Sequence, residues 1–323
     1  MPEESATAES VSGQHNECAL EAVVLRPRLS ERIWGFEKLP DFLEQPQPGR
    51  PVGEAWLTAM ECVDVSTGES LGELTRRCPE EFGAVGGHEF PLLMKWLFPR
   101  EKLSVQVHPD DSQAQAVGEP RGKTECWYVL SAEPGATVAV GFNDHISHEE
   151  IEGAIANGTL EARLRNLPVK AGDMVFLEAG TVHAMNPGVV VLETQQYSDT
   201  TYRLYDYGRP RELHLERGLA VTKMDTRSGL IAPEQHDGFT RLAASPFFVV
   251  DRFDVAAGKP LGLGLGRRMQ ILVALGDGAA VELASGLSRK LPVGNAVVLP
   301  ASSARDCLLK GTQTTQVIRV AVP

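Results

Sequence analysis

The sequence predicts a mainly β protein made of two related β-barrel units with a few short helices. The chain has 323 residues, more than one hydrophobic core usually organises. Most of its apolar segments are short and bounded by Gly or Pro turns, as strands are. Gly172, five residues and Glu178-Ala-Gly-Thr-Val-His183 recur as Gly294, five residues and Pro300-Ala-Ser-Ser-Ala-Arg305. In each copy a Gly turn precedes an apolar strand, and a second turn should aim the last motif residue into the fold.

The expected elements begin at about Glu21. Residues 45–51 should form a loop, because three of the seven are Pro and lack a backbone donor. Residues 147–156 should form a helix that Ser147 caps and that Asn157-Gly158 ends. A second helix is expected at residues 70–82. Strands are expected at residues 53–58, 91–98, 103–108, 124–130, 136–141, 173–177, 181–185 and 189–194.

Charge and hydropathy limit the partners that this chain could bind. The net charge is −12, from 31 basic and 43 acidic side chains, which argues against nucleic acid and anionic membrane surfaces. No apolar run approaches the ~20 residues of a membrane span. Residues 1–20 contain four Glu and no Lys or Arg, so we expect a disordered acidic tail and not a secretory signal. An anionic ligand would need local positive charge.

The cysteines predict a reducing compartment. Their number is odd and none belongs to a Cys-x-x-Cys pair, so the sequence favours free thiols in a cytoplasmic protein and excludes a zinc finger. They are Cys18, Cys62, Cys78, Cys126 and Cys307.

Residues 103–108 are the segment around which a site is most clearly predicted. Apolar and polar residues alternate there, so a strand would place Gln106 and His108 on the same face. Pro109 should end the strand, and residues 110–111 favour a turn, which puts both polar side chains near a strand end. Alternatively, the two side chains line the solvated face of an antiparallel strand.

The repeated motif resembles the second motif of the cupin family, Gly-x5-Pro-x-Gly-x-x-His. The chain is therefore similar to a double cupin, although Glu178 stands where Pro is usual in the first copy. In the second copy Arg305 replaces the His and Gln270 occupies the place of a Glu, so that copy should bind no metal. We expect a catalytic, metal-binding unit at residues 21–230 and a degenerate unit at residues 231–323.

Four side chains of the first unit could bind a metal ion. Two imidazoles, one carboxylate and one amide suit a divalent first-row ion, zinc by preference, and one ion per chain is expected. Because only one of these ligands is anionic, the ion would keep positive charge and could polarise a carbonyl. A buried, hydrogen-bonded histidine is the alternative for His183. The candidate ligands are Gln106, His108, Glu125 and His183.

Further motifs resemble class I mannose-6-phosphate isomerase, the phosphomannose isomerase family. They are Pro91-Leu-Leu-Met-Lys-Trp-Leu, Glu101-Lys-Leu-Ser-Val-Gln-Val-His-Pro-Asp-Asp, Gly122-Lys-Thr-Glu-Cys-Trp-Tyr-Val-Leu, Ala179-Gly-Thr-Val-His-Ala and Ser198-Asp-Thr-Thr-Tyr-Arg-Leu-Tyr-Asp-Tyr-Gly-Arg. The resemblance implies the short bacterial form, because no helical domain fits between Glu125 and His183. It also implies that the four candidate ligands bind zinc, that Arg203 is catalytic, and that Lys95, Ser104 and Lys123 bind the substrate.

Three positions depart from the family pattern. Phe36 replaces the second Gly of Trp-Gly-Gly, Ala55 replaces a Ser, and Tyr197 replaces an Asn. Trp34 and Phe36 are expected to cover the core. Tyr197 adds bulk near the predicted pocket, which leaves open a different sugar phosphate as substrate.

Interconversion of an aldose and a ketose phosphate needs a cation near O1 or O2, a base, and a clamp for the phosphate. The metal would supply the cation, and the Lys and Arg side chains would clamp the phosphate. The base could be Glu193, Asp199, Lys123 or a metal-bound water. Two other functions stay open, a cupin oxygenase and a non-catalytic sugar-phosphate-binding protein. The sequence does not decide between a monomer and a homodimer.

Overall fold

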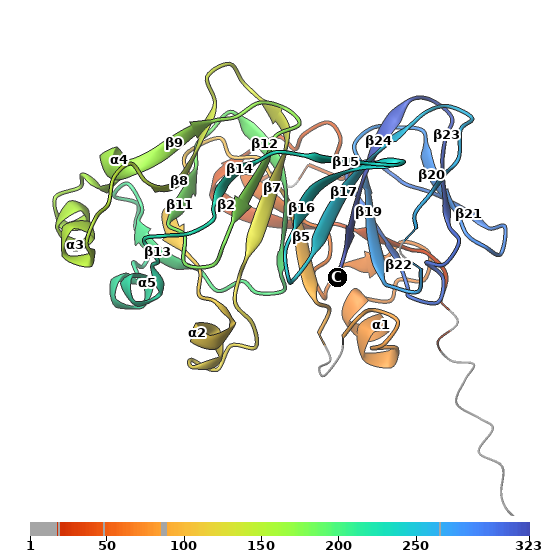
Figure 1. Ribbon diagram of the computed structural model, residues 1–323, viewed down its shortest axis with the longest axis horizontal. Coiled ribbons are helices and arrows are strands. Elements are labelled where there is room, and N and C mark those ends of the chain that lie inside the picture. The colour runs from red at the N-terminus through yellow and green to blue at the C-terminus, as the bar shows by residue number, and fades with distance from the viewer. Residues whose placement is uncertain (1–17, 19, 48, 85–88, 265) are drawn as a thin grey trace, which may run out of the picture.

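The computed structural model describes residues 18, 20–47, 49–84, 89–264 and 266–323, and it shows two units of stacked β-sheets (Figure 1). In the first unit, a seven-stranded and a five-stranded sheet enclose a core that includes Trp127 and Val138. In the second unit, an eight-stranded and a four-stranded sheet enclose a core that includes Leu272 and Val281. The predicted mainly β, two-unit fold is confirmed. The predicted tail at residues 1–20 lies outside the described residues except for Cys18 and Leu20.

All strand pairs within the four sheets are antiparallel. The seven-stranded sheet has the order β14 (Gly229–Ile231), β10 (Met174–Leu177), β7 (Glu125–Ala132), β12 (Val189–Gln196), β5 (Leu92–Leu97), β3 (Val52–Trp56) and β2 (Arg28–Phe36). The five-stranded sheet has the order β13 (Tyr202–Tyr205), β6 (Val105–Val107), β11 (His183–Met185), β8 (Thr137–Phe142) and β9 (Leu164–Pro168). Each strand predicted in this unit overlaps one of these strands.

The second unit and the helices complete the fold. The eight-stranded sheet has the order β15 (Glu234–His236), β16 (Phe239–Ala244), β17 (Val249–Val255), β24 (Thr315–Ala321), β19 (Gln270–Ala274), β22 (Ala296–Leu299), β1 (Val23–Arg26) and β4 (Val63–Asp64). The four-stranded sheet has the order β18 (Leu261–Gly262), β23 (Leu308–Gly311), β20 (Ala279–Glu282) and β21 (Ser288–Lys290). The helices are α1 (Leu71–Arg77), α2 (Asp111–Gln115), α3 (His148–Ala156), α4 (Leu160–Arg163) and α5 (Leu215–Val221).

A hydrophobic cluster between the large sheets joins the two units. It combines Leu92 and Trp96 of β5 with Ile271 of β19 and Val298 of β22. In addition, the N-terminal strand β1 pairs with β22, so residues expected in the first unit extend the sheet of the second. The boundary at residue 230 stays a prediction. Strands β1 and β4 precede residue 230 in the chain, yet they belong to the eight-stranded sheet of the second unit.

The register of the sheets supports the internal repeat. Glu125 pairs with Leu177 in the first unit, and Gln270 pairs with Leu299 at the corresponding position in the second. The expectation that Arg305 points into the fold is wrong, because its side chain is 64% exposed and pairs with Asp306. A buried Arg needs a charged partner, as Arg319 has in Asp251 within this unit, and Arg305 has no such buried partner among the described residues.

Several local predictions are corrected by the structure. Helix α1 has Ser70 as N-cap but ends at Arg77, five residues before the predicted end at 82, because Cys78 precedes a proline and leaves the helical conformation. The turn predicted at 110–111 is the start of helix α2, which Asp110 caps by accepting a hydrogen bond from the Gln113 backbone. The predicted helix at 147–156 is confirmed as α3.

The prediction of five free thiols is wrong, because Cys18 and Cys78 form a disulfide across a sequence separation of 60. Cys62, Cys126 and Cys307 are free and buried. An odd number of cysteines still permits a disulfide between two of them. The fold brings Cys18 and Cys78 together, although their spacing in the sequence does not indicate it. Cysteine usage therefore does not support a reducing compartment.

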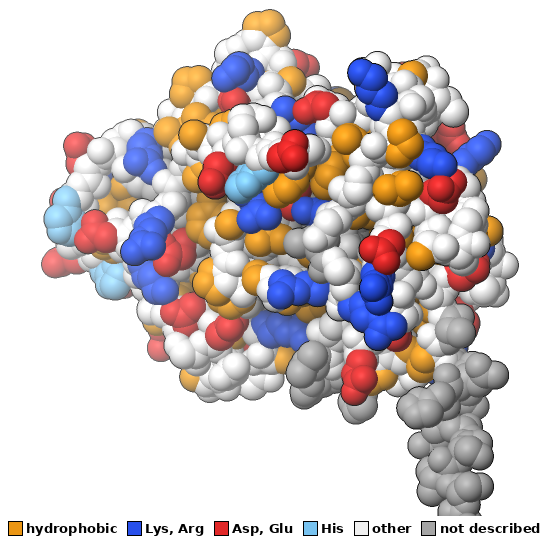
Figure 2. All heavy atoms as spheres, turned by 45° about the vertical axis from the view of Figure 1, so that its right-hand side comes forward, with side chains coloured by type: hydrophobic (Ala, Val, Ile, Leu, Met, Phe, Trp, Pro, Cys, Tyr) orange, Lys and Arg blue, Asp and Glu red, His pale blue; other side chains and the backbone are white. Residues whose placement is uncertain are grey.

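The surface and the helices add two observations. Basic and acidic side chains are interspersed over the face in Figure 2. No helix in the described part of the chain is long and apolar enough to cross a membrane.

Candidate metal centre

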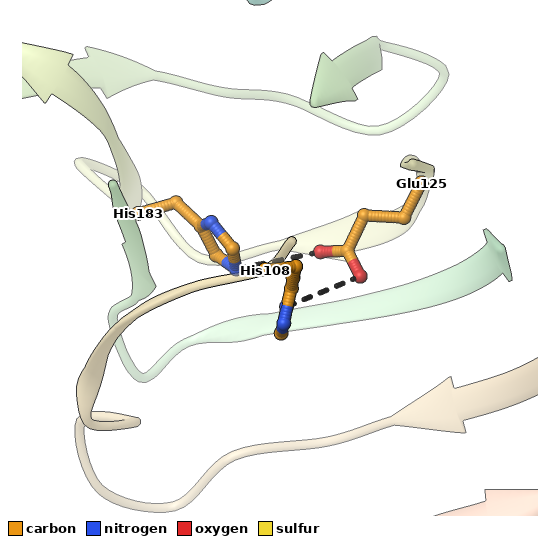
Figure 3. A group of neighbouring side chains, drawn as sticks. All are labelled: His108, Glu125 and His183. Carbon is orange, nitrogen blue, oxygen red and sulfur yellow. Dashed lines mark ion pairs between the residues drawn. The ribbon is translucent and has the colours of Figure 1, made fainter. Parts of the chain in front are cut away.

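Three predicted ligands meet in the first unit, each from a different segment (Figure 3). Their candidate ligand atoms all lie within 4.8 Å of one another. Glu125 Oε2 lies 3.6 Å from His108 Nε2, and Glu125 Oε1 lies 3.5 Å from His183 Nε2. Each carboxylate oxygen therefore faces one imidazole nitrogen, and Figure 3 shows both rings on the same side of the carboxylate.

The strands explain this convergence. His108 follows β6, Glu125 begins β7, and His183 begins β11. His183 pairs with Gln106 across the β6–β11 ladder, which brings the Gln106 amide nitrogen to 3.3 Å from His183 Nε2. The structure thus brings all four predicted ligands together, and the reading of Gln106 and His108 as merely solvated side chains is wrong for His108, which is buried.

Backbone carbonyls select the tautomer of both histidines. His108 Nδ1 lies 2.9 Å from the Thr200 carbonyl oxygen, and His183 Nδ1 lies 2.9 Å from that of Thr181. Each Nδ1 can donate its hydrogen there, which leaves the lone pair on Nε2, the nitrogen that faces Glu125. Burial lowers the pKa of His108 well below its ordinary value and lowers that of His183 to about 4. Both rings are therefore neutral at pH 7, as metal ligands must be.

Glu125 gives the clearest sign that a cation belongs in this group. Both of its carboxylate oxygens are buried and accept no hydrogen bond from the described residues. Lys123 Nζ lies 2.8 Å from Oε2 as an ion pair and also lies 3.0 Å from His108 Nε2. Oε1 has no such partner in the described part of the chain, and because a buried carboxylate oxygen without one is costly, a divalent ion between these donors would satisfy it. The side chains present fit such an ion.

A cavity of about 460 Å³ opens beside this group, between the seven-stranded and the five-stranded sheets. Five residues that the sequence singled out line it: Lys95, Ser104, Gln106, Lys123 and Arg203. Both carboxylates considered as a base, Glu193 and Asp199, also line it. The predicted site residues therefore share one cavity.

Lys95 and Lys123 are buried cations with carboxylate neighbours. Lys95 Nζ lies 3.6 Å from Glu193 Oε2 and 3.4 Å from Asp199 Oδ1. Burial alone would lower the pKa of Lys123, but the charges of Glu125 and Glu193 outweigh it and leave that pKa raised. Both lysines are therefore buried parts of the cavity wall and not exposed surface residues.

Comparison with known proteins assigns the chain to a family. The family described as phosphomannose isomerase type I, catalytic domain, matches residues 23–140. The mannose-6-phosphate isomerase of Streptococcus mutans is 37% identical over 252 residues, which cover 73% of this chain and 79% of that protein. The chain belongs to the type I phosphomannose isomerase family. A Bacillus subtilis mannose-6-phosphate isomerase, 39% identical over 67% of this chain and 71% of its own length, agrees with this.

Solved structures of phosphomannose isomerases share the fold. A crystal structure of the mannose 6-phosphate isomerase from Bacillus subtilis covers 93% of this chain and 99% of its own, with a TM-score of 0.82 and 31% identity. A zinc-bound mannose 6-phosphate isomerase structure covers 94% of this chain and 99% of its own chain, with a TM-score of 0.76 and 18% identity. The resemblance stated from the motifs is thereby confirmed.

Arg203, which the phosphomannose isomerase resemblance marks as catalytic, lies on β13 opposite Gln106. Its Nη1 donates to the Glu212 carbonyl at 2.8 Å, and its backbone nitrogen donates to His214 Nδ1 at 3.2 Å. His214 is therefore partly buried against β13. Arg203 has no carboxylate within 4.0 Å among the described residues, unlike the lysines above.

The two candidate carboxylates differ in environment. Glu193 is buried, and its Oε1 accepts a hydrogen bond from Trp127 Nε1 at 3.0 Å. Burial and then the charge of Glu125 raise the pKa of Glu193. The Asp199 side chain is 60% exposed. Only Glu193 has the desolvated environment that moves a carboxyl group toward general-base strength near neutral pH.

The departures from the phosphomannose isomerase pattern lie away from the metal group. The Tyr197 hydroxyl accepts a hydrogen bond from the Met60 backbone nitrogen at 2.9 Å, and its ring packs against the cluster between the two units. Tyr197 does not line the cavity, so its bulk does not reshape it. Trp34 is buried as expected, whereas the expectation for Phe36 is wrong because it is 41% exposed.

Sequence reasoning missed four charged cavity residues. Glu31, Arg32, Glu54 and Arg211 line the cavity with the residues predicted. Glu54 stands in the Gly-Glu-Ala-Trp segment of β3, where a carboxylate within an otherwise apolar strand was a signal for a functional position. Arg32 and Arg211 lie in segments whose charge alone did not separate them from surface residues.

Proposed function

We propose that this chain is a metal-dependent aldose-ketose isomerase that interconverts mannose 6-phosphate and fructose 6-phosphate through an enediolate. The observation that carries this proposal is a buried carboxylate flanked by two neutral imidazoles at a cavity lined by cations from two sheets. Membership of the phosphomannose isomerase family supports the choice of reaction.

The metal would be held by Gln106, His108, Glu125 and His183, and zinc suits this set of donors. When bound, the ion would polarise the substrate carbonyl and favour its enediolate form. One ion per chain is expected, because the equivalent place in the second unit has Gln270 and the exposed Arg305.

The cavity cations would hold the phosphate dianion and stabilise negative charge during the reaction. Lys95, Ser104 and Lys123 are proposed to bind the substrate, and Arg203 is proposed to be catalytic. Arg203 suits this role because no carboxylate lies within 4.0 Å of its guanidinium group among the described residues, so its charge is available to an anion.

Proton transfer between C1 and C2 is assigned to Glu193. The carboxylate has a raised pKa and lines the cavity, which suits a base that must take up and return a proton. Lys123 is a poor candidate, because its raised pKa keeps it protonated. Its ammonium group can instead stabilise negative charge on the substrate.

A coupled assay with mannose 6-phosphate tests the proposal. Purified protein should produce fructose 6-phosphate, should exchange the C2 proton with solvent deuterium, and should lose turnover on chelation and regain it with added zinc. Binding of the sugar phosphate without turnover would favour the non-catalytic sugar-phosphate-binding alternative, and consumption of oxygen would favour a cupin oxygenase. We also propose a cytoplasmic location, which cell fractionation would test, and light scattering would decide between monomer and homodimer.

A further inference from the structure

Arg32 and Glu54 form a paired unit in the wall of the cavity. Arg32 Nε donates to Glu54 Oε1, and Nη2 donates to Oε2, both at 2.9 Å, while Nη1 donates to the Glu31 carbonyl at 3.2 Å. Glu54 is buried and Arg32 is partly exposed, and both line the cavity. A two-bond Arg–carboxylate contact fixes the plane of both groups.

A second set of contacts connects this pair to the predicted substrate-binding lysine. Trp56 Nε1 donates to Glu54 Oε2 at 2.6 Å, which holds the indole ring in place. Lys95 Nζ lies 4.5 Å from the centre of that ring. Burial would raise the pKa of Glu54, but the charges of Lys95 and Arg32 keep it lowered, so the carboxylate stays ionised. Arg32, Glu54 and Trp56 therefore form one ordered wall on the seven-stranded sheet.

This wall differs in charge from the opposite one. The charges of Arg32 and Glu54 offset each other, whereas Arg203 has no carboxylate partner among the described residues and Arg211 shares Asp206 with Arg209. Burial and then the charge of Arg211 lower the pKa of Arg203, and both arginines line the cavity on this side. A phosphate dianion would therefore prefer the Arg203 side, and uncharged groups would remain for the Arg32 side.

We propose that the Arg32–Glu54 pair is a specificity-determining element that binds sugar hydroxyls, with Glu54 as the positioning residue for Arg32. The pair offers both N–H donors and carboxylate acceptors in one plane, which is what a hydroxyl needs to donate and accept at once. This inference rests on the proposed function, because it takes the ligand to be a sugar phosphate. It adds to that function the group that recognises the carbon chain rather than its phosphate.

Binding of two probes, measured by isothermal titration calorimetry, tests the inference in the full-length, metal-loaded protein. One probe is an alditol phosphate, the reduced sugar phosphate that keeps the hydroxyls but has no carbonyl to isomerise, and the other is inorganic phosphate. Arg32→Met and Glu54→Gln should each weaken binding of the alditol phosphate roughly 10- to 100-fold and change binding of inorganic phosphate less than about twofold. The double variant should lose no more affinity for the alditol phosphate than the single variant that binds it less tightly, because the two residues act as one unit.

Two variants provide the comparison. Arg211→Met, on the opposite wall, should weaken binding of inorganic phosphate. Arg50→Met is the matched control, because Arg50 pairs with Glu31 at 3.3 Å, is exposed and does not line the cavity, so both affinities should stay unchanged. Thermal unfolding of each variant checks that it folds.

The inference is overturned if Arg32→Met weakens the binding of inorganic phosphate as much as Arg211→Met does. It is also overturned if the folded Arg32→Met and Glu54→Gln variants bind the alditol phosphate with the affinity of the parent protein. Both probes measure binding, so they report on Arg32 even if the parent protein fails the coupled isomerase assay. Absence of turnover alone would refute the proposed function and leave the binding comparison valid.

Discussion

Replacement of Arg203 by Ala tests whether this arginine acts mainly on the transition state. Arg203 pairs through its backbone with Gln106, which places its side chain beside the proposed metal group. If it stabilises negative charge that develops on the substrate, its loss should reduce kcat more than it raises KM.

The size of the effect follows from the charges around the cavity. The ionisable residues that line it are five cations and four carboxylates: Arg32, Lys95, Lys123, Arg203 and Arg211 against Glu31, Glu54, Glu193 and Asp199. The formal sum is 5 − 4 = +1, and without Arg203 it is 0. Removal of one preorganised donor of this kind typically lowers kcat by roughly 100- to 1,000-fold. We expect a loss in that range for Arg203→Ala.

Steady-state kinetics with mannose 6-phosphate, run beside metal analysis and thermal unfolding, would measure this effect. Metal content and folding should not change, because Arg203 is not among the candidate ligands. Arg217→Ala, at an exposed position of α5, is the control and should behave as the parent protein. If Arg203→Ala raises KM and leaves kcat intact, Arg203 is only a binding residue and the reasoning is refuted.

Three further predictions concern metal, stability and specificity. His183→Ala should reduce bound divalent metal from about one ion per chain to near zero by elemental analysis, and retention of the ion would show that the ligand group is wrong. Cys78→Ser should lower the free energy of unfolding by about 4 kcal/mol in urea titrations under oxidising conditions, because the bond to Cys18 closes a loop with a sequence separation of 60. Dithiothreitol should lower the stability of the parent protein to the same value, and an unchanged midpoint would contradict both expectations. Tyr197→Asn should lower stability by about 1–3 kcal/mol, because it removes the hydroxyl that accepts from Met60, yet leave the preference among sugar phosphates unchanged. A changed preference in the coupled assay would show that Tyr197 influences the cavity.

Much of the site could be predicted because its signals are local in the chain. Alternation in residues 103–108 placed Gln106 and His108 on one face of a strand. The motif that begins at Gly172 placed His183 after a strand and a turn. Strand period and turn chemistry depend on near neighbours, so these inferences need no knowledge of strand order. For the same reason the repeat could be recognised, and the structure shows Glu125 and Gln270 at corresponding pairing positions.

The sequence by itself determined the mainly β class, the repeated unit and the set of metal-ligand candidates. Only the tertiary structure decided that Cys18 bonds to Cys78, that β1 joins the sheet of the second unit, and that Arg32 pairs with Glu54 in the cavity wall. These contacts join segments whose distance along the chain carries no periodic signal. They depend on which strands become neighbours and in which register, and the burial of the whole core selects that arrangement.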